Sequence, residues 1–530
     1  MTEGRKHSWW QRGVIYHIYP RSFQDTNGDG VGDLRGVTQR LDYLQWLGVD
    51  ALWLSPFYPS PMADFGYDIT DHCNVDPLFG TLENFDELLE EAHRLGLRVI
   101  VDYVPNHTSD EHPWFVESRS SRESPKRDWY IWEDPKPDGS PPNNWLSVFG
   151  GPAWEWDERT EQYYYHAFHR KQPDLNWRNP EVREAMYGVM RFWLKRGVDG
   201  FRVDALRHLV KDEELRDNPP NPDYQEGRPS YETQLPVYTT DRPEVHRIIS
   251  GMRRVLDGYG ADRVMIGELY LPFDRLVLYY GEDGRGVHLP TNMHLITTPW
   301  SAPSLAALVS EYEAALPPYG WPNWVLGNHD NPRIATRIGP EKARAAAVLL
   351  LTLRGTPTMY YGDEIGMSDG KIPPEHLHDP AGEEAPHLGR DPARTPMQWS
   401  DTPNAGFCPP DTRPWLPLSS DHRRRNVAVQ RLDPHSILSL YRRLLRLRRS
   451  EPALSIGSYE PLEATSSLLA YARSYAERRL LIALNLGDAP TSLPRTLQGR
   501  ILLSTSPQEE GHTLHPSTRL FPGEALVVAP

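Results

Sequence analysis

Cysteine is nearly absent from the sequence. Only Cys73 and Cys408 occur among 530 residues, which excludes a disulfide-rich secreted scaffold. One disulfide between them is an alternative, but two free thiols in a reducing compartment fit the count better. The first ten residues carry charges and lack the apolar segment of a secretory signal, so none is expected. The sequence therefore predicts a cytoplasmic protein.

Long apolar runs and excess positive charge are absent as well. No stretch of about 18 apolar residues occurs, which predicts no transmembrane helix and no membrane partner. The formal net charge is −15, whereas nucleic acids bind to basic surfaces, so no nucleic-acid partner is expected. A neutral small molecule fits this composition best, and the sequence leaves open whether the protein is a monomer or a homodimer.

What the sequence does contain is an alternation of strand-like and helix-like segments. An apolar strand at 51–54 is followed by an amphipathic helix at 82–95 and by a second strand, RVIVDY, at 98–103. This order predicts a parallel sheet. The other predicted strands are 13–19, 198–204, 263–268, 324–326 and 356–361, and the other predicted helices are 37–47, 180–196 and 437–448.

Two long stretches interrupt this alternation. Residues 106–172 lack a sustained period but are rich in aromatic residues, which indicates an inserted subdomain rather than a disordered linker. A polar, proline-rich excursion covers 362–426. From about residue 459 onward, short strands with Gly and Ser turns predict a small antiparallel β domain.

The fold class predicted from this organisation is α/β, with a (β/α)8 TIM barrel. A doubly wound sheet is disfavoured because no glycine-rich phosphate loop opens the first helix. The predicted domains are a discontinuous barrel of residues 1–105 and 173–455, an inserted subdomain of 106–172 after the third strand, and a β-sandwich-like domain of 456–530.

Acidic residues occur where predicted strands end. Asp102, Asp204 and Glu268 each lie at or near the end of a strand, and Asp330 closely follows another. Carboxylates at the carboxyl ends of barrel strands open into the catalytic mouth of a TIM barrel. Any one of them could instead cap a loop, but four together predict an active site.

Arg202 and Asp204 are two residues apart on one predicted strand, so their side chains point to the same side. We expect this arginine to keep the neighbouring carboxylate ionised, as a nucleophile requires. A buried structural ion pair is the alternative.

The motifs around these acids resemble those of glycoside hydrolase family 13. The similar segments are, in order, Asp102-Tyr-Val-Pro-Asn-His107, Gln172-Pro-Asp-Leu-Asn-Trp177, Gly200-Phe-Arg-Val-Asp204, Ile266-Gly-Glu-Leu269 and Gly327-Asn-His-Asp330. The QPDLN form, Gly66-Tyr-Asp68 and Gly389 to Trp399 are typical of the α-glucosidase branch. The resemblance runs from about residue 9 to about residue 447.

This resemblance implies a retaining mechanism without a catalytic cofactor. Asp204 would be the nucleophile and Glu268 the general acid/base, with their carboxyl groups about 5–5.5 Å apart. Asp330 would bind sugar hydroxyls and help to distort the ring. The substrate-binding residues implied are Asp68, Tyr67, His107, Phe149, Phe168, Arg202, His329, Arg390 and Arg394. For Phe149 and Phe168, core packing is an equal alternative.

The segment from Asp25 to Asp33 has oxygen ligands at alternate positions and glycine at the sixth, like the first part of an EF-hand loop. The twelfth position is Gly36, so the bidentate glutamate is missing, and a polar turn is the alternative. The resemblance implies a structural Ca²⁺ or Mg²⁺, held by Asp25, Asn27, Asp29, Val31 and Asp33. The histidines lack zinc spacing such as HExxH.

The expected activity is hydrolysis of terminal α-linked glucose from disaccharides and short oligosaccharides, with some transglucosylation. In similar α-glucosidases a valine after the nucleophile accompanies α-1,6 cleavage and a smaller residue α-1,4 or broader use, so the resemblance implies that Ala205 favours α-1,4 linkages, a preference of only about 1–3 kcal/mol. Alternatives are a glucosyltransferase or isomerase on the same fold, a sucrose hydrolase, and a non-catalytic relative such as the ectodomain-like subunit of amino-acid transporters. The last class lacks the catalytic acids and carries a membrane helix.

Overall fold

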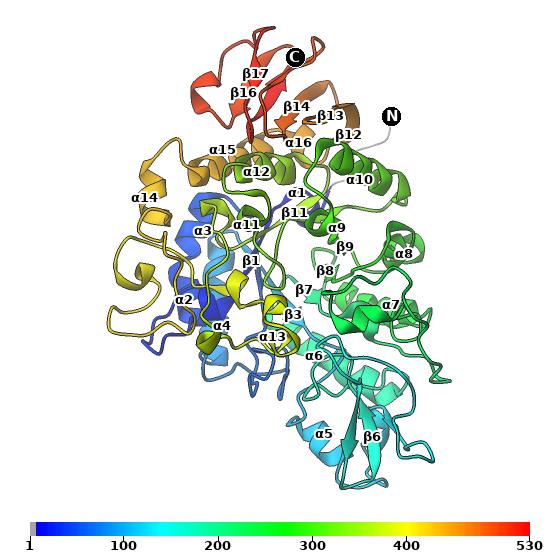
Figure 1. Ribbon diagram of the computed structural model, residues 1–530. Helices are drawn as coiled ribbons and strands as arrows, with labels where there is room; N and C mark the ends of the chain where they lie inside the picture. Colours follow the sequence, from blue (N-terminus) through cyan, green and yellow to red (C-terminus); the bar gives the residue numbers. More distant parts are fainter. Residues whose placement is uncertain (1–6) are drawn as a thin grey trace.

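Eight parallel strands form a closed barrel at the centre of the molecule (Figure 1). The computed structural model describes residues 7–530. The barrel strands are β1 (Ile15–Ile18), β2 (Ala51–Leu54), β3 (Arg98–Tyr103), β7 (Gly200–Val203), β8 (Val264–Gly267), β9 (Leu289–Asn292), β10 (Asn323–Val325) and β11 (Thr356–Tyr360). Their order is β1-β11-β10-β9-β8-β7-β3-β2. The predicted fold class is confirmed.

Amphipathic helices cover the outside of the barrel. In α4 (Leu82–Arg94), the Thr81 side chain caps the first turn, and Phe85, Leu88 and Leu89 turn inward and are buried. The main helices after β3 are α6 (Pro180–Arg196), α7 (Val245–Asp257), α10 (Ala302–Ala315), α12 (Ala343–Thr352) and α15 (Ile437–Ser450). No helix within residues 7–530 is long and apolar enough to cross a membrane.

Several elements differ from the sequence-based prediction, which did not include helices α7, α10 and α12. The helix expected at 37–47 is two helices, α2 (Leu34–Gln39) and α3 (Leu41–Leu47), because the backbone leaves the helical region at Arg40. Strand β9 was missed, since its sequence, LPTN, contains a proline and no apolar alternation. It is nevertheless buried throughout, as a barrel strand must be.

The segment between β3 and β7 forms a compact unit of its own. It contains α5 (Pro113–Ser118) and a three-stranded antiparallel sheet, ordered β4 (Trp132–Glu133), β6 (Gln162–Tyr165), β5 (Trp154–Asp157). Trp145, Trp154 and Tyr165 pack together in its core. These buried aromatic residues explain why a segment without periodicity is ordered.

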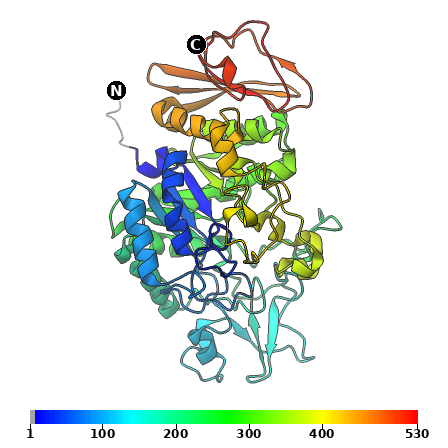
Figure 2. The same cartoon turned by 90° about the vertical axis from the view of Figure 1, so that its left-hand side faces the viewer.

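The C-terminal part is an antiparallel sheet of five strands, ordered β12 (Ser458–Ala464), β13 (Leu468–Tyr475), β14 (Arg478–Asn485), β18 (Ala525–Ala529), β16 (Arg500–Ser504). A two-stranded sheet of β15 (Thr491–Ser492) and β17 (Arg519–Leu520) accompanies it. Figures 1 and 2 show the C-terminal sheet and the β4-β6-β5 unit at opposite ends of the barrel. Neither of the two cysteines is in a disulfide, as predicted.

Candidate active site

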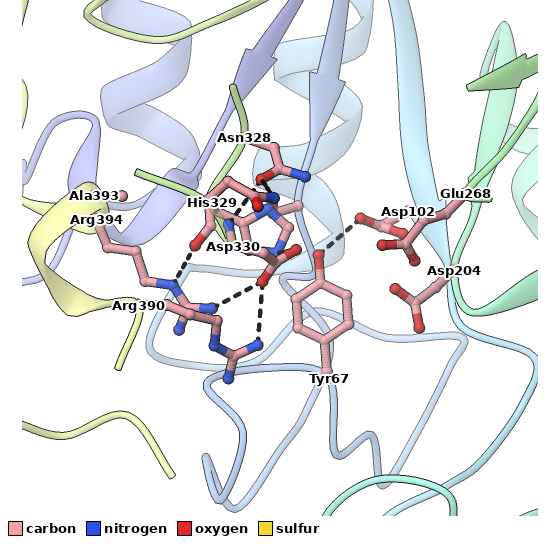
Figure 3. A network of polar contacts seen from close by, with 12 residues as sticks. Tyr67, Asp102, Asp204, Glu268, Asn328, His329, Asp330, Arg390, Ala393 and Arg394 are labelled. Carbon is pink, nitrogen blue, oxygen red and sulfur yellow. Dashed lines mark hydrogen bonds and ion pairs between the residues drawn. The ribbon is translucent and has the colours of Figure 1, made fainter. Parts of the chain in front are cut away.

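One arginine joins three acids, Asp102 near the end of β3, Asp204 directly after β7 and Glu268 directly after β8. Arg202 Nη1 donates to Asp204 Oδ1 at 2.6 Å and to Asp102 Oδ1 at 2.9 Å, and Arg202 Nη2 lies 2.9 Å from Glu268 Oε2. Asp102 also accepts hydrogen bonds from Trp53 Nε1 and from the Tyr67 hydroxyl, both at 3.2 Å. Figure 3 shows the three carboxylates gathered beside Tyr67. Acids from three strands thus share one guanidinium at the carboxyl end of the barrel.

Burial and mutual repulsion govern the protonation of this cluster. Burial raises the pKa of Asp204 well above its usual value; Arg202 opposes this shift, whereas Glu268 and Asp102 add to it. Burial likewise raises the pKa of Asp102 to about 6. Arg202 thus lowers the pKa of Asp204, in the direction expected from the sequence, but it does not outweigh burial. The cluster keeps a proton to higher pH than separate carboxyl groups would.

A second ionic group lies on the other side of Tyr67 (Figure 3). Asp330 Oδ1 accepts hydrogen bonds from Arg390 Nη1 at 3.1 Å and from Arg394 Nη2 at 3.2 Å. Burial alone would raise the pKa of Asp330, but these arginines and Arg202 bring it below its usual value. Asp330 therefore remains ionised, as an acceptor for sugar hydroxyl groups must be.

Aromatic and imidazole rings line the space between these groups. The rings of Tyr67 and His329 are stacked, with centroids 5.3 Å apart and planes 2° from parallel. Burial lowers the pKa of His107 to about 4 and that of His329 well below its usual value. Both imidazoles are therefore neutral at pH 7. The two ring nitrogens of His107 each lie 3.2 Å from a side-chain amide nitrogen, of Asn106 and of Gln172, whereas His329 Nδ1 has no hydrogen-bond partner within residues 7–530.

Phe149 and Phe168 are half-buried and contact predicted site residues. The Phe168 ring lies 5.3 Å from that of His107, and the Arg390 guanidinium lies 5.1 Å from the centre of the Phe149 ring. Phe168 also packs against the aromatic core of the β4-β6-β5 unit. The structure thus brings both rings to the group of predicted site residues.

Asp68 is the one predicted side chain that the structure turns away from this group. Its oxygens accept hydrogen bonds from the Ser60 hydroxyl and from the Ala63 and Asp64 amides of its own loop. Asp64 takes the expected position instead: its Oδ1 lies 2.6 Å from Arg390 Nη2. Sequence reasoning missed Asp64, although it stands only two residues before Gly66 of the quoted motif.

A buried lysine that sequence reasoning also missed holds one wall of the site. Lys211 is ion-paired with Asp174 and donates to Asn106 Oδ1 at 3.1 Å, and its side chain is 2% exposed. Asp174 in turn accepts the Ala167 amide at 2.8 Å. Lys211 therefore ties the loop after β7 to the segments that carry His107 and Phe168. Lys211 is followed by Asp212, Glu213 and Glu214, so the sequence did not distinguish it from an exposed charge.

Replacing Lys211 with methionine is expected to lower the free energy of unfolding by about 3–5 kcal/mol, because Asp174 loses its buried partner. Denaturant unfolding measures the loss. The double variant with Asp174→Asn serves as the control and should recover part of the stability, since no charge is then left unpaired. An unchanged midpoint in Lys211→Met contradicts this role for the ion pair.

The loop from Asp25 to Asp33 is folded around its own amides. Asp25 Oδ1 accepts the Gly28 amide at 2.7 Å, and Asp29 Oδ1 accepts the Val31 amide at 2.8 Å. Asp33 accepts the Gly36 amide at 2.7 Å and caps α2. Within residues 7–530, no three His, Cys, Asp or Glu side chains lie close enough together to hold a metal ion. The donors available are all oxygens, the type that Ca²⁺ and Mg²⁺ prefer.

Comparisons with known proteins identify the family of this chain. The family described as "Alpha amylase, catalytic domain" matches residues 17–457, and the C-terminal residues 458–528 match a domain of unknown function, DUF3459. The chain belongs to the α-amylase family. This is glycoside hydrolase family 13, so the predicted family membership is confirmed.

Relatives in this family cover nearly the whole chain. A probable α-glucosidase of Rhizobium meliloti (strain 1021) is 46% identical, covering 91% of this chain and 90% of the relative. An oligo-1,6-glucosidase of Heyndrickxia coagulans is 40% identical, covering 98% and 99%. The crystal structure of the α-glucosyl transfer enzyme XgtA superimposes with a TM-score of 0.91 at 42% identity, covering 99% of this chain and 100% of that one.

Proposed function

We propose that the protein is a retaining α-glucosidase that releases terminal, non-reducing α-linked glucose. The observation that carries the proposal is the arrangement of Asp204 and Glu268, from adjacent strands, around the single guanidinium of Arg202. The names of the relatives support glucosides as the substrate class. The non-catalytic alternative is not retained, because the acids are present and converge.

The proposed reaction has two steps. Asp204 attacks the anomeric carbon and forms a covalent glucosyl-enzyme, while Glu268 protonates the departing oxygen; Glu268 then deprotonates the incoming water. The reaction needs the proton of the carboxyl cluster on Glu268 and an ionised Asp204, a division that the 2.6 Å bond from Arg202 to Asp204 favours. The family's reaction needs no catalytic cofactor.

The ionic group around Asp330 would hold the terminal glucose. Asp330 and Arg390 present a charged acceptor and charged donors on the side of Tyr67 away from Asp204 (Figure 3), and Asp64 is ion-paired with Arg390. Such charged hydrogen bonds bind sugar hydroxyl groups more strongly than neutral ones do. A binding site that ends at these charged residues would accept the terminal sugar of a substrate but not an internal one. His107 and His329 would contact this sugar as neutral groups, and His329 Nδ1 is available for a hydrogen bond.

A panel of maltose, isomaltose, sucrose and trehalose tests the proposal, with the anomer of the released glucose followed by NMR. The proposal predicts α-glucose as the first product, and faster cleavage of maltose than of isomaltose, because Ala205 is small. First release of β-glucose would exclude retention. Cleavage of sucrose alone would favour the sucrose hydrolase alternative.

Transfer to an acceptor other than water is the second candidate function. The structural similarity to the α-glucosyl transfer enzyme favours it, since the same glucosyl-enzyme can react with another hydroxyl group. Product analysis with maltose and a phenolic acceptor measures the ratio. A transferase gives mostly glucosylated acceptor at millimolar concentrations, whereas a hydrolase gives mostly glucose.

The length of the substrate is expected to affect the rate of hydrolysis, because the segment after the nucleophile strand is anchored to other parts of the protein. Within residues 207–242, Gln234 Nε2 donates to the Asn144 carbonyl of the inserted unit at 2.7 Å, and the Gly227 carbonyl lies 3.0 Å from His387 Nε2. We predict that kcat/KM for maltose exceeds that for maltoheptaose by about tenfold or more, since loops on this face shape the site. Equal values for both substrates contradict this prediction.

We also propose that the loop from Asp25 to Asp33 binds a structural Ca²⁺ or Mg²⁺. Its carboxylates, the Asn27 amide and the Val31 carbonyl would supply oxygen ligands. The midpoint of thermal unfolding is expected to rise with added CaCl₂, by the equivalent of about 2.7 kcal/mol at a hundredfold excess over Kd. The variant Asp29→Ala should abolish the rise. No change in the native protein, together with no metal by elemental analysis, contradicts the proposal.

A cytoplasmic location is proposed because both thiols are free, which fits a reducing compartment. Cell fractionation with antibody detection tests this location. The oligomeric state, monomer or homodimer, is measured by light scattering.

A further inference from the structure

The peptide amide directly after Asp204 points across the site to Glu268. The Ala205 N–H donates to Glu268 Oε2 at 3.0 Å, and Arg202 Nη2 lies 2.9 Å from the same oxygen. Oε2 therefore accepts the Ala205 N–H and lies at ion-pair distance from the Arg202 guanidinium, and both neighbours favour the oxygen of the carboxyl group that carries no proton. The acidic proton of Glu268 is accordingly assigned to Oε1.

The backbone at Ala205 is shaped to make this contact. The Asp204 amide still donates to the Tyr103 carbonyl of β3 at 2.9 Å, so the ladder of the barrel ends there. Ala205 then adopts a left-handed conformation, φ 47° and ψ 31°, and begins the 3₁₀ turn η3 (Leu206–His208). For a residue with a Cβ this conformation costs about 1–2 kcal/mol. A strained backbone conformation of this kind persists only where many surrounding interactions hold it in place, and such conformations are concentrated at functional sites.

We propose that the Ala205 amide is a positioning donor for the acid/base, holding Oε2 inward so that the protonated Oε1 meets the glycosidic oxygen. This inference rests on the proposed role of Glu268. In the first step the bond from C1 to the glycosidic oxygen breaks, and its electron pair goes to that oxygen. The oxygen takes the Oε1 proton while Asp204 forms the new bond to C1.

The amide also stabilises the carboxylate that this step leaves behind. A fixed N–H aimed at developing negative charge lowers the barrier without reorganising. Its contribution depends on the leaving group: a sugar alkoxide must be protonated, whereas a dinitrophenolate leaves without help. If the amide had only a structural role, its loss would slow the cleavage of both kinds of substrate equally.

The test replaces Ala205 with its hydroxy-acid counterpart, lactic acid, so that an ester oxygen replaces the N–H and the methyl group is kept. We expect kcat/KM for maltose to fall about tenfold, the effect of one charge-assisted hydrogen bond, and kcat/KM for 2,4-dinitrophenyl α-glucoside to change less than about twofold. The alkaline limb of the maltose pH profile should move to higher pH, because the lost N–H stabilised the carboxylate that forms when the acid gives up its proton.

The matched control is the same ester at Ala153, whose amide donates to the Trp145 carbonyl at 2.9 Å inside the inserted unit. It should leave both substrates and the pH profile unchanged. Equal losses on both substrates with an unmoved profile, or no loss on maltose, overturn the inference. A Glu268→Gln variant measured alongside separates the two claims: if it keeps its turnover of maltose, the proposed function itself fails.

Discussion

Replacing Asp204 with asparagine is expected to lower kcat/KM for maltose by about 10⁴-fold or more. The amide cannot form the covalent glucosyl-enzyme, and losses of this size are typical when a nucleophile is removed. The fold should persist, because asparagine has the same shape and can still accept a hydrogen bond from Arg202. Initial rates on maltose, with circular dichroism to check folding, measure the effect.

An Asp68→Asn variant is a suitable control for this change. Asp68 has the same chemistry and is also buried, but its oxygens bond only within its own loop. It should lose far less activity than Asp204→Asn. Near-normal turnover by Asp204→Asn would remove the nucleophile assignment.

The second large effect is expected for Glu268→Gln. Loss of general acid catalysis should reduce kcat/KM for maltose by about 10²–10⁴-fold. The loss on 2,4-dinitrophenyl α-glucoside should be much smaller, since that leaving group needs no proton. The alkaline limb of the pH profile should disappear as well, because glutamine does not titrate.

A uniform loss on both substrates contradicts the assignment of Glu268 as the acid. So does an alkaline limb that survives the substitution. Either result would mean that another carboxyl group is the general acid. The candidate would then be Asp102, which is also ion-paired with Arg202.

The sequence predicted the barrel because its strands are short apolar runs at regular intervals, separated by helices with capping residues. The predicted strand at 98–103 and the predicted helix at 180–196 coincide with β3 and α6. Strand β9 was not predicted, because its burial depends on its neighbours in the barrel rather than on the hydrophobicity of its own residues. The break between α2 and α3 at Arg40 was not predicted either, because the spacing of the apolar residues continues through it.

The catalytic acids could be predicted for a physical reason: carboxylates after parallel strands meet at one end of the barrel. Positions off the strands were less predictable. The conformation of one loop decides whether Asp64 or Asp68 contacts Arg390. The sequence shows two aspartates close together but not this conformation. The protonation of Asp204 depends on burial and on three neighbouring charges, none of which is visible in the motif.

Labelling with 5-fluoro-α-glucosyl fluoride tests the central claim most directly. The fluorine slows the breakdown of the glucosyl-enzyme, so the covalent intermediate accumulates and can be located by peptide mass spectrometry. A retaining α-glucosidase of this geometry should carry one fluoroglucosyl group, on the peptide that contains Asp204. A label on any other residue, or no label together with release of β-glucose from maltose, would contradict the account.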